Sequence, residues 1–586
     1  MRAKCICILI GYILVTLSTC RIRTRWRNTE AAGPARDGMS WQIMPSYESY
    51  GEARATFRWR LPVKFNPGVD LVRSHDSDRV AVIYEQSDGD VSTHTYGELD
   101  EQSDRLAAGL RGLGIEAGDR VAVVVPQKPA NPIVHLAAWK LGAISVPLTV
   151  LFGPEALEYR LTDSEARAVV VDPSVRETVE QLRDDCPALE FVIDLDEPPG
   201  SGAHSVESLI TRHEPGIDSV ESTPETPSAI MYTSGSTGPP KGVLHSHALW
   251  LGRAAAAFNY FDHGLDDAAT LWTPADWAWG AALGGTLFAG LHYGSTVVAW
   301  PRETFDPPAV FSLLARHDVT HSFLPPTALR MLMGVDDPAE RFDLSLQALA
   351  AAGEPLTPEI LQWAADTFEN VPVNEFHGQT ELNLVVGNCS RWFAAHPESM
   401  GKPLPGYELR VVDPDDPDPA NPLARGEVGE LAVKPADRRL FFDEYWKLPE
   451  KTAEKQVDGW FLTGDLVRRD SAGYCWFVSR TDDVILTSGY RVGPMEIESV
   501  LLEHPAVEQA GVIGVPDDLR GEAIKAFVQP AAGVDEPAAL KSELTALVRE
   551  QLADYEYPRE IKFVDSLPTT TTGKIQRRAL RERRDT

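Results

Sequence analysis

The chain has 586 residues, more than one hydrophobic core usually organises, so we expect at least two domains. Apolar residues make up 43% and aromatic residues 8%, a composition that is typical of globular proteins and excludes a disordered chain. The 86 acidic residues outnumber the 55 Lys and Arg residues and give a formal charge of −31, so we expect neither nucleic acid nor an anionic membrane surface as a partner of the protein body.

The first 28 residues do not share this acidic character. They include basic residues and no acidic one, with an apolar run from Cys5 to Leu17 that is short for a membrane span and suits a signal-peptide core. Three interpretations stay open: a secretion or lipid-attachment signal, a short membrane anchor, or an upstream extension ahead of a start near Met39. We favour the third, which makes residues 1–38 an atypical extension of a cytoplasmic protein and allows membrane contact only if residues 1–28 are present.

From about residue 79, short apolar segments alternate with longer amphipathic ones. Residues 120–126 predict a buried strand, residues 131–143 predict a helix that begins near Pro132, and residues 144–148 predict the next strand. The series continues with strands predicted at residues 166–172, 190–195, 229–234, 294–300 and 319–326. Strands that alternate with helices indicate parallel sheets covered on both faces, which is an α/β architecture.

The pattern changes near residue 480. Residues 504–518 and 522–530 predict two strands that flank a turn, and a helix around residues 537–552 and a basic tail follow. We interpret this part as a small α+β domain of about 100 residues.

The cysteines and the H-x-H pair predict no zinc site. Cys186, Cys389 and Cys475 are far apart and form no C-x-x-C pair, so neither a disulfide framework nor a zinc site is expected. His245 and His247 form an H-x-H pair without a third ligand nearby, and we expect a structural role for both.

A loop rich in Gly, Ser and Thr follows the strand predicted at residues 229–234. One interpretation is a flexible surface connection. The other is a phosphate-binding loop, in which Gly235, Gly238 and Gly242 let backbone N–H groups approach an anion and Lys241 adds a charge. The loop is not a Walker A motif, because Lys241 follows Pro240 and precedes Gly242.

Five separated segments occur in order and together carry a family resemblance: YTSGSTGPPKG (232–242), FHGQTE (376–381), GWFLTGD (459–465), SRTDDVILTSGYRVGPMEIE (479–498) and PTTTTGKIQRR (568–578). They resemble the adenylate-forming superfamily of acyl-CoA synthetases, adenylation domains and luciferases, and most of all its acetyl-CoA and medium-chain acyl-CoA synthetases. The resemblance covers about residues 45 to 586. It implies a large domain of parallel-type sheets flanked by helices, with a small β subdomain (residues 39–481), and a mobile α+β domain (residues 482–586) that rotates about a hinge at Asp482.

The resemblance also implies the reaction and its cofactors. A carboxylic acid attacks the α-phosphate of ATP to give an acyl-adenylate and pyrophosphate, and the thiol of CoA then displaces AMP. Glu381 is similar to the family's Mg²⁺-binding acid, Thr380 contacts phosphate beside it, and Lys574 reaches the α-phosphate. The β- and γ-phosphates are expected to contact Thr233, Ser234, Gly235, Ser236, Thr237, Gly238 and Lys241.

Further positions are expected to contact the nucleoside and CoA. Asp465 accepts both ribose hydroxyls, and Arg480 reaches the ribose or a phosphate, although Ser479 stands where the family usually has Gly. One wall of the adenine site is expected at Gly353, Glu354 and Pro355, the other at Glu375, Phe376 and His377, and the CoA contacts at Gly489, Tyr490 and Arg491.

The sequence constrains the identity of the substrate acid less than it constrains the nucleotide site. Trp279, Gly280 and Ala281 resemble the lining of the acyl pocket, and acetate-specific relatives carry a Trp at the position of Gly378 and a larger residue at that of Gly280. We therefore expect propionate, butyrate or longer aliphatic acids over acetate. The alternative is that these glycines serve packing and say nothing of the substrate.

Two other functions stay open. One is transfer of the acyl group to the phosphopantetheine thiol of a carrier protein instead of CoA. The other is an inactive binding protein tethered to a membrane by residues 1–28. Five retained residues argue against it: Lys241, Glu381, Asp465, Arg480 and Lys574.

Overall fold

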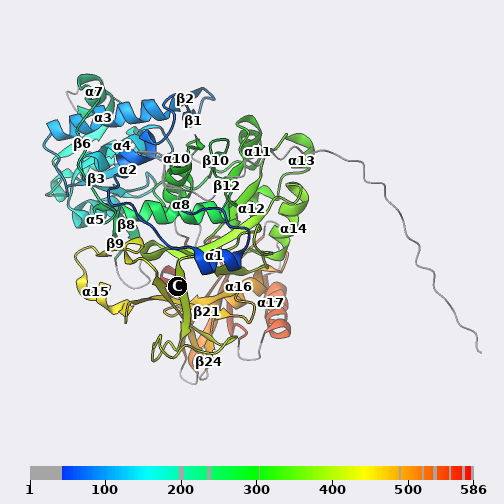
Figure 1. Ribbon diagram of the computed structural model, residues 1–586. Coiled ribbons are helices and arrows are strands. Elements are labelled where there is room, and N and C mark those ends of the chain that lie inside the picture. Colours follow the sequence, from blue (N-terminus) through cyan, green and yellow to red (C-terminus); the bar gives the residue numbers. More distant parts are fainter. Residues whose placement is uncertain are drawn as a thin grey trace, which may run out of the picture.

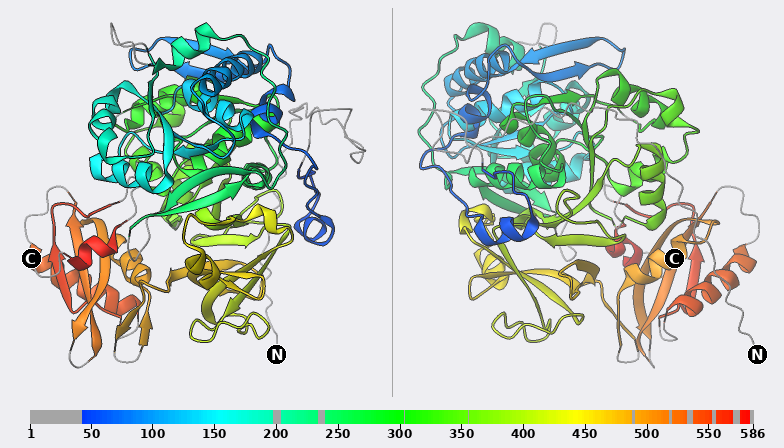
Figure 2. Two further views of the ribbon diagram at one scale, coloured as in Figure 1. Left: turned by 90° about the vertical axis from the view of Figure 1, so that its left-hand side faces the viewer. Right: turned by 45° about the vertical axis from the view of Figure 1, so that its right-hand side comes forward.

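The computed structural model describes residues 43–196, 204–233, 239–302, 304–354, 356–487, 490–517, 520–531, 537–552, 556–569 and 575–582. Figures 1 and 2 show a large body in which helices pack around two sheets, and a smaller C-terminal domain at its lower edge. The predicted mixed α/β fold with a small C-terminal domain is confirmed. Within the described residues, no helix combines the length and apolar character that a membrane crossing requires.

The first sheet has eight strands among the described residues, in the order β19-β9-β8-β4-β3-β5-β6-β7. Its centre is parallel, as the alternation of strands and helices predicted, whereas β8 and β9 form an antiparallel hairpin. The strands are β3 (Arg120–Val124), β4 (Ile144–Pro147), β5 (Ala166–Val171), β6 (Phe191–Asp194), β7 (His204–Ser205), β8 (Pro227–Thr233), β9 (Lys241–Ser246) and β19 (Glu444–Tyr445).

The second sheet changes character along its width. Six strands pair in parallel, in the order β14-β13-β12-β10-β11-β1. At the end of this run, β14 pairs with β15 in the antiparallel sense. The remaining strands continue antiparallel, so the predicted small β subdomain is an extension of this sheet. The strands are β1 (Val80–Glu85), β2 (Val91–Thr95), β10 (Thr270–Trp272), β11 (Thr296–Ala299), β12 (His321–Phe323), β13 (Ala348–Ala351), β14 (Val373–Gln379), β15 (Asn383–Gly387), β16 (Ser399–Pro403), β17 (Tyr407–Val412), β18 (Val428–Pro435), β20 (Gln456–Val457), β21 (Trp460–Arg469) and β22 (Cys475–Arg480).

Helix α8 (Ala248–Tyr260) lies at the centre of the large body (Figure 1). It contacts β9 of the first sheet and β14 and β15 of the second, and all of its side chains are buried. Most of its residues are apolar, which suits a position between two sheets, and the exceptions include Arg253 and Asn259. The other helices of the large body are α1 (Tyr50–Thr56), α2 (Pro67–Arg73), α3 (Tyr96–Gly112), α4 (Ala130–Lys140), α5 (Pro154–Ser164), α6 (Arg176–Gln181), α7 (Val206–Arg212), α9 (Gly280–Ala282), α10 (Ala289–Tyr293), α11 (Pro307–Arg316), α12 (Pro326–Leu332), α13 (Pro338–Arg341), α14 (Pro358–Thr367) and α15 (Pro449–Glu454).

The C-terminal domain has its own sheet and core. The two strands predicted to flank a turn are β25 (Val507–Asp517) and β26 (Gly521–Pro530), which pair antiparallel, and the predicted helix is α17 (Pro537–Gln551). Their apolar faces pack with α16 into a core separate from that of the large body. The remaining elements are β23 (Ile485–Thr487), β24 (Tyr490–Val492), β27 (Glu560–Phe563), α16 (Pro494–Leu502) and α18 (Arg577–Glu582).

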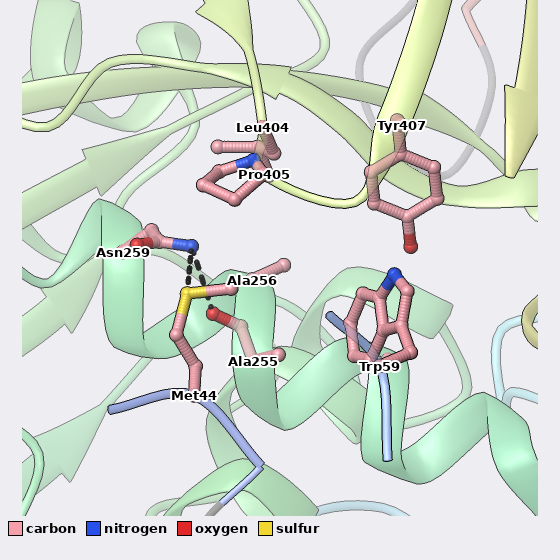
Figure 3. Close-up of a pocket in the computed structure, with 9 residues that line it drawn as sticks. Met44, Trp59, Ala255, Ala256, Asn259, Leu404, Pro405 and Tyr407 are labelled. Atoms are coloured by element: carbon pink, nitrogen blue, oxygen red, sulfur yellow. Dashed lines mark hydrogen bonds between the residues drawn. The ribbon is translucent and has the colours of Figure 1, made fainter. Parts of the chain in front are cut away.

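The segment before α2 is packed onto the large body. The sulfur of Met44 accepts a hydrogen bond from Asn259 of α8 at 3.0 Å, and Arg54 donates to the carbonyl of Tyr407 at 2.7 Å. Figure 3 shows the shallow hollow that this packing leaves between Met44, Trp59, α8 and the turn before β17. The hollow holds none of the predicted site residues.

Candidate active site

A lysine and a carboxylate lie on either side of one tyrosine, where the two sheets approach each other. Glu381 is buried in the single helical turn that follows β14, and its Oε1 accepts a hydrogen bond from the hydroxyl of Tyr445 at 2.6 Å. Tyr445 lies in β19 beside β9, and the Nζ of Lys241, the first residue of β9, is 4.3 Å from the centre of its ring. Partial burial lowers the pKa of Lys241, and the charge of Glu381 opposes that shift.

A second cluster surrounds Asp465 in β21. Its Oδ2 accepts hydrogen bonds from His377 at 3.1 Å and from Gln379 at 2.7 Å, and its Oδ1 accepts one from Arg480 at 2.8 Å. Arg480 is the cross-strand neighbour of Asp465 in the β21–β22 pair. Burial alone would raise the pKa of Asp465, but the hydrogen bonds and charges of His377 and Arg480 outweigh it and hold the pKa low. This buried carboxylate is therefore ionised.

The two clusters interact electrostatically. The charge of Glu381 contributes to the raised pKa of Arg480, and the charge of Arg480 contributes to the lowered pKa of Lys241. The two clusters thus share one region at the carboxyl ends of β8 and β14. This region holds two cations and two carboxylates that were predicted from segments up to more than 200 residues apart: Lys241, Arg480, Glu381 and Asp465. In α/β proteins this edge of the sheet is where ligands bind.

Sequence reasoning missed two members of these clusters. Gln379 lies inside the quoted segment FHGQTE, and it donates to the carbonyl of Thr463 at 2.9 Å as well as to Asp465. Its place two residues from Glu381 was the signal that could have found it. Tyr445 belongs to none of the five segments, and only the pairing of β19 with β9 reveals it.

The predicted walls of the adenine site are only partly exposed. The carboxylate of Glu354 accepts a hydrogen bond from Thr327 at 2.7 Å and pairs with Arg330. Phe376 is buried and stacks on Tyr260 with ring centres 4.3 Å apart, so its side chain points into the core. Of the second wall, only the side chain of His377 faces the Asp465 cluster.

Glu375 is a buried carboxyl with an unusual pKa. The amide of Leu356 donates to it at 3.4 Å, and burial raises its pKa to about 8. An unfolded Glu has a pKa of about 4.3, so the folded protein holds this proton more tightly than the unfolded chain does. The contribution of Glu375 to the free energy of unfolding is therefore greatest at low pH and is lost as the pH rises from about 4 to about 8.

We expect Glu375→Gln to remove this pH dependence. The amide keeps the shape and cannot ionise, so the variant should gain stability relative to wild type as pH rises, on the order of a few kcal/mol by pH 8. Thermal unfolding of both proteins between pH 5 and pH 8.5 measures the difference. A gap between the two melting temperatures that stays constant over this range would contradict the assignment.

The two glycines of the predicted acyl pocket differ in their surroundings. A Cβ built on Gly280 would lie 3.4 Å from Nη2 of Arg253 and 3.5 Å from the sulfur of Met231, which are ordinary contacts. A Cβ on Gly378 would lie 2.0 Å from the carbonyl oxygen of Asn383 in the adjacent strand β15. The space expected at Gly378 is therefore filled by backbone, and the packing interpretation holds there. Trp279 precedes α9, and its neighbour Ala281 is half-buried.

Several predicted positions lie outside the described residues: Ser234, Gly235, Ser236, Thr237, Gly238, Pro355, Gly489 and Lys574. The flanks of two of these segments are described. Thr233 and Lys241 are paired across the β8–β9 hairpin, and Thr569 and Ile575 form an antiparallel bridge. Tyr490 and Arg491 contribute backbone to β24, and Asp482 follows β22, where its Oδ1 lies 3.4 Å from Nε of Arg480.

The surroundings of Glu381 suit Mg²⁺ and those of His245 and His247 do not suit a metal. Mg²⁺ usually binds one or two carboxylates together with phosphates and water, and Glu381 offers a carboxylate held in place by Tyr445. Burial lowers the pKa of His245 to about 3 and that of His247 to about 4, in keeping with the predicted structural role. Among the described residues, no three His, Cys, Asp or Glu side chains group closely enough to hold a metal by themselves.

Comparison with known proteins places this geometry in context. Residues 71–446 match the model of AMP-binding enzymes, and residues 496–574 match that of the AMP-binding enzyme C-terminal domain. The acetyl-coenzyme A synthetase of Bacillus subtilis (strain 168) is 36% identical over 529 residues, which cover 88% of this chain and 90% of that protein. The mitochondrial acyl-coenzyme A synthetase ACSM4 of Homo sapiens is 34% identical over 537 residues, covering 89% of this chain and 91% of that protein.

Solved structures agree with the sequence relatives. The anthranilate CoA ligase AuaEII in complex with anthranoyl-AMP superimposes with a TM-score of 0.80 at 28% identity, over 90% of this chain and 98% of that one. ATP-bound MatB from Rhodopseudomonas palustris gives a TM-score of 0.77 at 28% identity, over 88% and 98% of the two chains.

Proposed function

The chain belongs to the AMP-binding enzymes of the adenylate-forming superfamily, and from this premise we propose that it is an AMP-forming acyl-CoA synthetase for short- to medium-chain carboxylic acids. One observation carries the proposal: Tyr445 holds Lys241 and Glu381 at one end of a site whose other end is the ionised Asp465 bound by His377 and Arg480. This arrangement offers a cation and a metal-binding carboxylate for phosphates, and a charged acceptor for ribose hydroxyls.

In the first half-reaction, a carboxylate oxygen of the acid attacks the α-phosphorus of ATP, and the bond to the β-phosphate oxygen breaks to release pyrophosphate. We assign Lys241 and the loop from Thr233 to Gly238 to the departing phosphates, and Thr380 to the phosphate beside Glu381. Mg²⁺ bound by Glu381 would supply charge neutralisation on the phosphate oxygens. Asp465 accepts the ribose hydroxyls after exchanging its contacts with His377 and Gln379, which share its Oδ2.

In the second half-reaction, the thiol of CoA attacks the acyl carbon, the bond to AMP breaks, and the thiol proton passes to solvent or to a base. We propose that residues 482–586 rotate about Asp482 between the two steps, so that Lys574 leaves the site and Gly489, Tyr490 and Arg491 approach it. The separate core of that domain supports movement as a unit, because rigid bodies with their own cores rotate about short hinges.

Incubating the purified protein with ATP, Mg²⁺, CoA and a panel of C2 to C12 acids tests the proposal. We expect AMP, pyrophosphate and an acyl-CoA in equal amounts, with acids longer than acetate favoured because Gly280 carries no side chain that would shorten the acyl pocket. Adenylate without thioester would favour the phosphopantetheine thiol of a carrier protein as acceptor. No product with any acid would overturn the proposal and favour the binding-protein alternative.

A further inference from the structure

Arg253 is a buried cation for which the described residues supply no hydrogen-bond or ion-pair partner. It lies in α8 between the two sheets and is 3% exposed. Among the described residues it makes no hydrogen bond or ion pair, and its buried Nε has no acceptor. Burial lowers its pKa to about 10, which still leaves the guanidinium charged at neutral pH. A buried charge is tolerated in a protein when something pairs with it, so this one requires an anion.

The guanidinium points to the predicted acyl pocket. A Cβ on Gly284 would lie 2.9 Å from Cγ of Arg253, so the aliphatic part of the arginine side chain passes over Gly284. A Cβ on Gly280 would lie 3.4 Å from Nη2 of Arg253, so the guanidinium lies beside Gly280. The sulfur of Met231, two residues before the end of β8, also lies close to Gly280. Side chains at either glycine would compete with Arg253 for this space.

The described groups that act on the charge of Arg253 do not neutralise it. The titratable groups that influence the pKa of Arg253 are the hydroxyls of Tyr260 and Tyr407. Burial raises the pKa of both tyrosines, so both are neutral phenols and neither supplies a negative charge. Tyr260 already donates its hydroxyl to the carbonyl of Gly285 at 3.0 Å. His245 is also neutral, because burial and the charge of Arg253 lower its pKa to about 3.

We propose that Arg253 binds a second carboxylate of the substrate, so that the enzyme activates one end of a dicarboxylic acid while the other end pairs with the guanidinium. The inference rests on the proposed function and narrows its acid from any short- to medium-chain acid to one with a distal carboxylate. Arg presents donors in a fork that matches a carboxylate in two parallel hydrogen bonds, and this geometry fixes the distance between the two ends of the acid. The distal carboxylate is bound and is not changed in the reaction.

Matched pairs of acids test the inference. The full chain is assayed for pyrophosphate release with butyrate and succinate, valerate and glutarate, and hexanoate and adipate, at saturating ATP, Mg²⁺ and CoA. We expect the dicarboxylate to exceed its partner by at least 10-fold in kcat/KM at one or more chain lengths. Activity with monocarboxylates that exceeds that with dicarboxylates at every length would overturn the inference and leave the proposed function standing. No pyrophosphate with any acid would instead refute the proposed function.

A variant series locates the effect at Arg253. Arg253→Met replaces the guanidinium by an unbranched apolar side chain without charge, and should lower the dicarboxylate-to-monocarboxylate ratio at least 100-fold, mainly through KM. Arg253→Lys keeps the charge without the fork and should retain part of the preference. Arg111→Met, at an exposed arginine on α3, is the matched control and should leave the ratio unchanged. An unaltered ratio in folded Arg253→Met would refute the role of Arg253.

Stability without ligand gives an independent readout. Replacing an unpaired buried charge by an apolar side chain of similar size is often neutral or stabilising. The melting temperature of ligand-free Arg253→Met should therefore equal or exceed that of wild type. A clear fall would show that Arg253 has a partner within the protein and would overturn the inference.

Discussion

Replacing Lys574 with alanine is expected to lower the rate of acyl-adenylate formation by about 100- to 1,000-fold, the size of effect seen when one charge-stabilising donor is removed from an active site. The residue belongs to the segment between Thr569 and Ile575, whose ends are joined by an antiparallel bridge. Beyond it, Arg577 of α18 pairs with Asp483 at 3.3 Å, next to the proposed hinge. The described residues that follow Lys574 are thus joined to the proposed hinge by an ion pair.

Two assays separate the half-reactions. Pyrophosphate release from ATP and acid measures the first, and acyl-CoA formation from acyl-adenylate supplied ready-made measures the second. The variant should fail in the first and match wild type in the second, because the proposed rotation removes Lys574 before CoA enters. Lys541→Ala, at an exposed lysine on α17 of the same domain, is the matched control. Full-speed adenylate formation by the Lys574 variant would contradict its role.

The second large effect is expected for Glu381→Gln. The amide has the shape of the carboxylate, and its oxygen can still accept the hydrogen bond from Tyr445, so the fold should be kept. The lost negative charge removes the ligand that Mg²⁺ requires, and adenylate formation should fall by about 100- to 1,000-fold with a higher demand for Mg²⁺.

The comparison with Tyr445→Phe sharpens this prediction. Phenylalanine keeps the ring that packs on Lys241 and removes only the hydroxyl, leaving the charge of Glu381 in place. Its effect on adenylate formation should be less than about 10-fold, in proportion to one hydrogen bond to a charged group. Magnesium titrations of pyrophosphate release compare the two variants. Equal losses in both would show that orientation of the carboxylate matters and its charge does not.

Much of the fold could be predicted from local patterns. Residues 120–126 are a continuous apolar run that predicts a buried strand, and the observed β3 lies within it. The strands predicted at residues 504–518 and 522–530 are observed as β25 and β26, and β26 begins one residue earlier than predicted. The second sheet was less predictable. The strands β15 to β22 could form a separate subdomain or extend the parallel sheet. The antiparallel pairing of β14 with β15 decides this, and backbone hydrogen bonds between strands leave no periodic pattern in the sequence.

The sequence by itself determined the family, because five short segments each carry chemistry that a nucleotide site needs, and their order is readable without a fold. Only the tertiary structure decided which side chains share that site. Tyr445 reaches Glu381 because β19 pairs with β9, and Gly378 is a glycine because a carbonyl lies against it. Arg253 is buried because helix α8 is enclosed by the two sheets, and no described residue pairs with its charge. Burial and contact between distant segments are properties of packing, and packing is set by the whole chain.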